Sequence, residues 1–66
     1  MKIFVNGAAT DYEKELSVAE LVQRHGLAPE STLVELNGVA LHRREWETQR
    51  LGENDRVEVL RVAAGG

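Results

Sequence analysis

The residues of this chain that could do chemistry stand at its end. The sequence closes on Val-Ala-Ala-Gly-Gly, so an apolar run is followed by Gly65 and Gly66. Ordering glycine costs more backbone entropy than ordering any other residue, and the pair has no side chain to pack, so it contributes nothing to a fold. It can, however, thread a channel too narrow for other backbones. Residues 62–66, if extended, reach roughly 15 Å at about 3.3 Å per residue. The pattern predicts a tail that presents its terminal carboxylate to the active site of another enzyme.

The chemistry of such a tail depends on activation of the Gly66 carboxylate. A carboxylate is a poor electrophile until it is activated, for example as an acyl-adenylate, from which a sulfur nucleophile can displace AMP and leave a thiocarboxylate. The chain has no cysteine, so it offers no thiol nucleophile, persulfide or thiolate metal ligand of its own. The sulfur would then be carried on the C-terminus. The alternative is a frayed end without a function.

The other titratable residues favour structural roles. His25 and His42 lack a metal-ligand spacing such as His-x-x-x-His, so we expect surface or cap histidines and no metal site. Glu13, Glu15 and Glu20 stand near the start of a predicted helix, where carboxylates stabilise the positive end of the helix dipole. We therefore expect no catalytic residue and no bound cofactor in this chain.

Length and charge restrict the class of protein further. Sixty-six residues allow one domain with little room for a deep cleft. A net charge of -3 argues against a nucleic-acid surface and favours a basic protein partner. No apolar run approaches the roughly 20 residues of a spanning helix, and the N-terminus does not resemble a secretory signal. We expect a cytoplasmic protein without a membrane contact.

Strand and turn signals dominate the first part of the chain. Residues 1–12 read as a hairpin, because apolar and polar residues alternate up to Asn6-Gly7, a strong signal for a two-residue turn. The second arm has few strand-forming residues, so we expect it at an edge of the sheet.

One helix is predicted within residues 16–29. Ser17 and Glu20 have the spacing of a capping box, and Leu16 and Leu21 have that of a hydrophobic staple. Gly26 suits the left-handed residue that ends a helix.

The remaining segments complete a sheet. Residues 32–41 read as strand, Asn-Gly turn and strand, and residues 56–62 as a last strand after a turn at 52–55. Between them we expect Trp46 and Leu51 to anchor an irregular segment onto the core. One helix can cover one face of such a sheet. The prediction is an α+β fold of the β-grasp type: a mixed four- or five-stranded sheet with the first and last strands parallel at its centre. Residues 1–62 would form the domain and residues 63–66 a flexible tail.

The outer face of this sheet carries apolar side chains. Alternation that sends Val57 and Val59 toward the helix sends Phe4, Leu60 and Val62 to the opposite face, where we expect them to be neighbours on adjacent strands. Exposed apolar patches often mark protein contacts, so we predict that these three residues dock a partner.

Five stretches carry a resemblance that covers the whole chain: "MKIFVNG", "SVAELVQRHGL", "VELNGVALHRREWE", "LGENDRVEVL" and "VAAGG". They resemble the ThiS-type sulfur carrier proteins of thiamine biosynthesis, which are ubiquitin-like β-grasp proteins. One departure is that His42 stands before Arg43 and Arg44, where the family commonly has proline.

The resemblance implies a protein co-substrate rather than an enzyme, monomeric when free. A ThiF-type adenylating enzyme would use ATP to activate the C-terminus of Gly66, and a cysteine desulfurase or rhodanese-like protein would supply the sulfur. Thiazole synthase would then take the sulfur into the thiazole ring. Gly66 would carry the reacting group, while Gly65, Ala64 and Ala63 keep the tail slim.

Three alternatives remain at this point. The small subunit of molybdopterin synthase, or a carrier for another pathway, would share the fold and the thiocarboxylate chemistry. A ubiquitin-like protein modifier would instead join Gly66 to lysines of target proteins. A β-grasp binding module would have an inert tail.

Overall fold

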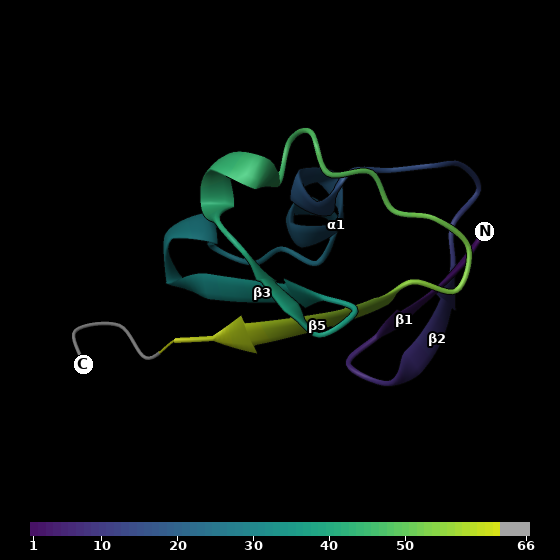
Figure 1. Cartoon of the computed structure of the whole chain (residues 1–66), viewed down its shortest axis with the longest axis horizontal. Helices are drawn as coiled ribbons and strands as arrows, with labels where there is room; N and C mark the ends of the chain where they lie inside the picture. Colours follow the sequence, from purple (N-terminus) through teal and green to yellow (C-terminus); the bar gives the residue numbers. More distant parts are fainter. Residues whose placement is uncertain (63–66) are drawn as a thin grey trace.

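The structure, a computed structural model, describes residues 1–62 and contains in that range five strands and one α-helix (Figure 1). The elements are β1 (Lys2–Val5), β2 (Ala8–Asp11), α1 (Val18–Arg24), β3 (Thr32–Leu36), β4 (Val39–Leu41) and β5 (Arg56–Arg61), with short 3-10 helices at Pro29–Ser31 and Arg43–Glu45. No helix among residues 1–62 has the length and apolar character needed to cross a membrane.

The five strands form one sheet in the order β2-β1-β5-β3-β4. The central neighbours β1 and β5 are parallel, and the other pairs are antiparallel. The chain passes from β2 through α1 to β3, and α1 lies on one side of the sheet (Figure 1). This mixed sheet with one helix confirms the predicted β-grasp fold, with β2 at an edge as expected.

Both hairpins turn at Asn-Gly pairs whose backbone is left-handed. The φ angles are 50° at Asn6 and 85° at Gly7, and 51° at Asn37 and 85° at Gly38. Positive φ at both central residues suits the right-handed twist of the flanking strands, and asparagine and glycine adopt it at the lowest cost. The two predicted hairpins are therefore confirmed.

Local hydrogen bonds define both ends of α1. The Ser17 side chain accepts from the Glu20 N–H at 3.1 Å, and the Glu20 carboxylate accepts from the Ser17 N–H at 2.7 Å, so the capping box is formed. The helix ends at Arg24, and Gly26 follows with φ of 67°, as predicted for the residue after the last turn.

The hydrophobic core lies between α1 and the inner face of the sheet. Trp46 and Leu51 are 4% and 1% exposed, which confirms that they anchor the irregular segment between β4 and β5. The other buried apolar residues are Ile3, Val5, Tyr12, Leu16, Val18, Leu21, Val22, Val34, Val57 and Val59. The alternation in β5 follows from this packing, since Val57 and Val59 face the helix layer and the residues between them face outward.

Candidate functional site

The last strand leads directly to the predicted reactive end of the chain. β5 lies at the centre of the sheet between β1 and β3, and its continuation, Val62, donates a backbone hydrogen bond of 2.8 Å to the Ser31 carbonyl. The residues predicted to form the tail, Ala63, Ala64, Gly65 and Gly66, lie outside the described residues. The point from which they leave is held by the sheet and by this hydrogen bond.

Asn6 extends the pairing of β5 beyond the end of β1. β1 ends at Val5, which pairs with Val57, whereas β5 continues to Arg61. The Asn6 amide oxygen accepts from the Val59 N–H at 2.8 Å, and the Asn6 amide nitrogen donates to the Val59 carbonyl at 3.2 Å. The side chain thus takes the place of a further strand residue. From the sequence Asn6 was interpreted only as a turn residue, and the Asn-Gly pair contains no signal for this second role.

Asn37 holds the start of the same strand. Its side-chain oxygen accepts from the Arg56 N–H at 2.9 Å, and its side-chain nitrogen donates to Asp55 Oδ1 at 3.1 Å. Asp55 Oδ2 also accepts from the Gly52 N–H at 2.7 Å, which closes the turn before β5. The strand that leads to the tail is therefore fixed at its start by Asn37 and along its length by Asn6.

Apolar side chains are exposed on the outer face next to the end of β5. Leu60 is 50% exposed and stands opposite Leu33 of β3, which is 57% exposed. Val62 is 47% exposed and lines a shallow hollow together with Leu33. We call these three residues, Leu33, Leu60 and Val62, the exit patch. Leu33 was not predicted from the sequence, although its alternation with the buried residues Thr32 and Val34 was a usable signal.

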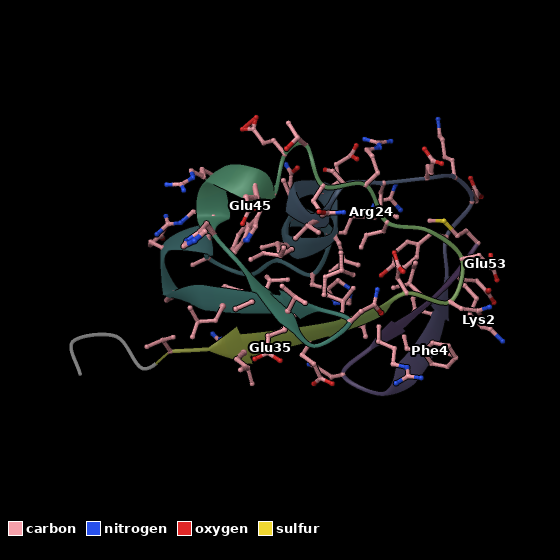
Figure 2. The ribbon with its side chains drawn as sticks, viewed as in Figure 1. Lys2, Phe4, Arg24, Glu35, Glu45 and Glu53 are labelled. Carbon is pink, nitrogen blue, oxygen red and sulfur yellow. The ribbon has the colours of Figure 1, made fainter. Side chains whose placement is uncertain are left out.

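The predicted proximity of Phe4 to Leu60 is wrong. The register of the parallel pair places Phe4 opposite Arg56, at the start of β5. Leu60 is four residues further along the strand, or about 13 Å at 3.3 Å per residue. Phe4 is half-buried, and Lys2 Nζ lies 5.6 Å from the centre of its ring. In Figure 2 Phe4 lies beside the β1–β2 hairpin, away from the end of β5.

Two side chains with shifted pKa values, Glu20 and Tyr12, lie in α1 and next to its C-terminal cap residue, respectively. The hydrogen bond from the Ser17 N–H, with smaller contributions that include nearby Arg50, lowers the pKa of Glu20. Burial raises the pKa of Tyr12, against the opposing effect of Arg24, and the Tyr12 hydroxyl lies 3.1 Å from His25 Nε2. Glu20 belongs to the capping box of α1 and Tyr12 to the core, so neither lies on the outer face with the exit patch.

The histidines also occupy helix ends. His25 is the C-terminal cap residue of α1, and His42 is the N-terminal cap residue of the 3-10 helix Arg43–Glu45, as expected for surface or cap histidines. Within residues 1–62 no group of three or more histidine, cysteine, aspartate or glutamate side chains is arranged to hold a metal ion.

The similarity of this chain to known proteins includes the predicted tail as well as the described domain. The ThiS family model matches residues 3–66. The crystal structure of the thiamine biosynthesis protein ThiS from Geobacter metallireducens is 33% identical, with a TM-score of 0.85 and complete coverage (100%) of both chains. A solution NMR structure of a thiamine biosynthesis protein from the same organism is 35% identical, with a TM-score of 0.83, and the match covers 100% of this chain and 88% of that one. No curated protein matches the chain significantly.

Proposed function

The chain belongs to the ThiS family, and from this premise we propose that it is a sulfur carrier protein that delivers sulfur for the thiazole ring of thiamine. The observation that carries the proposal is the family match through residue 66, on a chain whose central strand leads directly to the Gly-Gly end. In this role the protein is a co-substrate of partner enzymes rather than an enzyme.

The proposed chemistry takes place at the Gly66 carboxylate. A carboxylate oxygen attacks the α-phosphorus of ATP bound by a ThiF-type adenylating enzyme, and pyrophosphate leaves. The outer sulfur of a persulfide on a cysteine desulfurase or a rhodanese-like protein then attacks the acyl carbon, and AMP leaves with the electrons of the C–O bond, which gives an acyl disulfide. A thiol reductant supplies the two electrons that break the S–S bond and is itself oxidised to a disulfide. The thiocarboxylate remains on Gly66, and the sulfur donor regains its thiol. Thiazole synthase is the proposed acceptor of this sulfur.

The tail residues have a steric role in this proposal. Ala63, Ala64 and Gly65 have small side chains or none, so they fit a narrow channel that leads to the adenylating site. Four residues beyond Val62 reach about 13 Å when extended. The partner must therefore dock close to the end of β5, which is where the exit patch lies.

We further propose the exit patch as the main apolar contact of the adenylating enzyme. Leu60 and Val62 keep the docking role predicted from the sequence, and Leu33 joins them because it stands opposite Leu60. Phe4 belongs to a separate contact at the other end of the outer face, opposite Arg56.

The test is the intact mass of the chain after incubation with ATP, a ThiF-type activating enzyme and a sulfur donor. Replacement of one oxygen by sulfur adds roughly 16 Da. Gly65→Val should greatly slow this gain, because a β-branched side chain obstructs the channel. Its thermal midpoint should stay nearly unchanged, because the proposed tail does not pack against the domain.

A chain that lacks Gly66 is the control and should gain no mass. If the full chain also gains none, while the same enzyme modifies a known carrier, the sulfur function is wrong. Conjugates with other proteins that depend on Gly66 would then identify a protein modifier.

A further inference from the structure

Two carboxylates stand directly opposite each other on the outer face of the sheet. Glu35 of β3 and Glu58 of β5 are cross-strand partners. The Cβ atoms of such partners are about 5 Å apart, and like charges at this position destabilise a sheet. The fold thus holds two negative charges side by side at its centre.

No side chain among residues 1–62 forms an ion pair with Glu35 or Glu58. The two ion pairs in that range both use Arg50, which contacts Glu15 and Glu20 at the start of α1. Arg56 faces outward on the same strand as Glu58, yet it makes no ion pair with either carboxylate in the described part of the chain. The acidic pair, Glu35 and Glu58, is therefore available to an external cation.

The acidic pair lies between two apolar contacts. A shallow hollow of about 590 Å³ is lined by Glu35, Glu58 and Leu60, with Arg56 also at its wall, so the carboxylates border the exit patch. A second hollow extends from Glu58 to Phe4. Figure 2 shows Glu35 near the middle of the sheet and Phe4 by the hairpin. A partner that covers the exposed leucines must therefore also place a group over the carboxylates.

The chemistry of that group follows from the charges and from the reach of the tail. Unpaired carboxylates buried under a partner are costly unless a cation meets them. An arginine guanidinium is planar and has five donors, so it can bond both carboxylates at once, which a lysine ammonium does less well. The tail reaches only about 13 Å beyond Val62, so the enzyme that activates Gly66 must dock beside the end of β5, where the exit patch borders the two carboxylates.

We propose that the acidic pair, Glu35 and Glu58, receives an arginine side chain of the adenylating enzyme when the exit patch docks. This inference rests on the proposed sulfur-carrier function and adds the recognition chemistry of its partner. A guanidinium bound between the two carboxylates removes the repulsion between them. Binding of the arginine therefore relieves an unfavourable contact that the sheet already contains in the free protein.

The test is the affinity of the full chain for a ThiF-type activating enzyme, measured by calorimetry without ATP at low and at high salt. Glu35→Gln and Glu58→Gln keep the side-chain shape and remove the charge. Each should lower the affinity roughly 5- to 10-fold at low salt. The double variant should lose less than the product of the two, because both carboxylates bind one guanidinium. Its affinity should also depend less on salt than that of the wild type.

Glu47→Gln is the matched control. Glu47 is exposed and follows Trp46, whose carbonyl accepts a hydrogen bond from Ala19 of α1, so it belongs to the helix side of the molecule. This variant should bind as the wild type does. Thermal midpoints of the Glu35 and Glu58 variants should equal or exceed that of the wild type, because a repulsion is removed.

The possible outcomes separate this inference from the proposed function. Wild-type affinity in both glutamine variants, or an equal loss in Glu47→Gln, overturns the acidic-pair inference even if the wild type gains the mass of sulfur. An affinity loss confined to the Glu35 and Glu58 variants, in a chain that gains no sulfur, supports the surface and contradicts the sulfur function. A wild type that does not bind the enzyme overturns the inference.

Discussion

Asn6 has two structural roles. It adopts the left-handed backbone that the turn needs, with φ of 50°, and its amide group pairs with both polar backbone groups of Val59. Asparagine adopts this conformation more easily than other non-glycine residues, and its side chain carries both a donor and an acceptor. The end of β5 therefore depends on one side chain that comes from a turn.

Substitutions at Asn6 should separate the two tasks. Asn6→Gly keeps the backbone conformation and removes two hydrogen bonds, each contributing about 1 kcal/mol, so the free energy of unfolding should fall by roughly 1–2 kcal/mol. Asn6→Ala should cost about 1 kcal/mol more, because alanine tolerates positive φ poorly. Chemical denaturation of the two variants measures both effects. Equal stability of Asn6→Gly and the wild type would show that the amide pairing contributes nothing.

At the scale of elements, α1 depends on its capping box. The helix has seven residues, too few to be stable alone, so it depends on its cap and on the packing of Val18, Leu21 and Val22. The carboxylate of Glu20 accepts from the Ser17 N–H near the positive end of the helix. This hydrogen bond is the largest cause of the lowered pKa of Glu20.

The lowered pKa of Glu20 predicts a pH dependence of stability. The unfolded chain binds a proton at Glu20 near the ordinary value of 4.5, and the folded chain only at lower pH. The stabilisation from the charged form is therefore complete above that value and is lost as the pH falls through the lower pKa of the folded state. Glu20→Gln keeps a hydrogen-bond acceptor without a charge, so the stability advantage of the wild type should be present at neutral pH and vanish in acid. Denaturation curves across this pH range test it, and an advantage that persists in strong acid would contradict it.

At the scale of the whole molecule, the sheet divides the protein into a core side and an outer side. The core side packs under α1, while the outer face carries the exit patch, the acidic pair and, further away, Phe4. Because the side chains of β5 alternate between the two sides, burial of Val57 and Val59 also determines that Leu60 faces outward.

The separation of Phe4 from the exit patch predicts a pattern of additivity in binding. Leu60→Asp should weaken binding of the activating enzyme by roughly 10-fold or more, because it places a charge in the proposed apolar contact. Leu33→Asp should couple to it, because the two residues are cross-strand partners. Phe4→Asp should add independently, because it lies about 13 Å away along the sheet. Calorimetric double-mutant cycles measure both couplings, and stronger coupling of Leu60 to Phe4 than to Leu33 would contradict this division.

Features that depend on residues close together in the sequence could be predicted from local sequence patterns. The capping box at Ser17 and Glu20, the Asn-Gly turns and the alternation in β5 each involve residues a few positions apart, and all were predicted correctly. Trp46 and Leu51 were also recognised, since large apolar residues in a charged segment have few places other than the core.

Only the tertiary structure decided which residues meet across strands. The distance of Phe4 from Leu60, the pairing of Asn6 with Val59 and the opposition of Glu35 and Glu58 all depend on register. Register is set jointly by the packing of distant segments and by turn geometry, and a shift of one residue moves every side chain to the other face. A single sequence determines the order in which outward-facing side chains follow along each strand. Their neighbours on the adjacent strands are determined only when the strands pair.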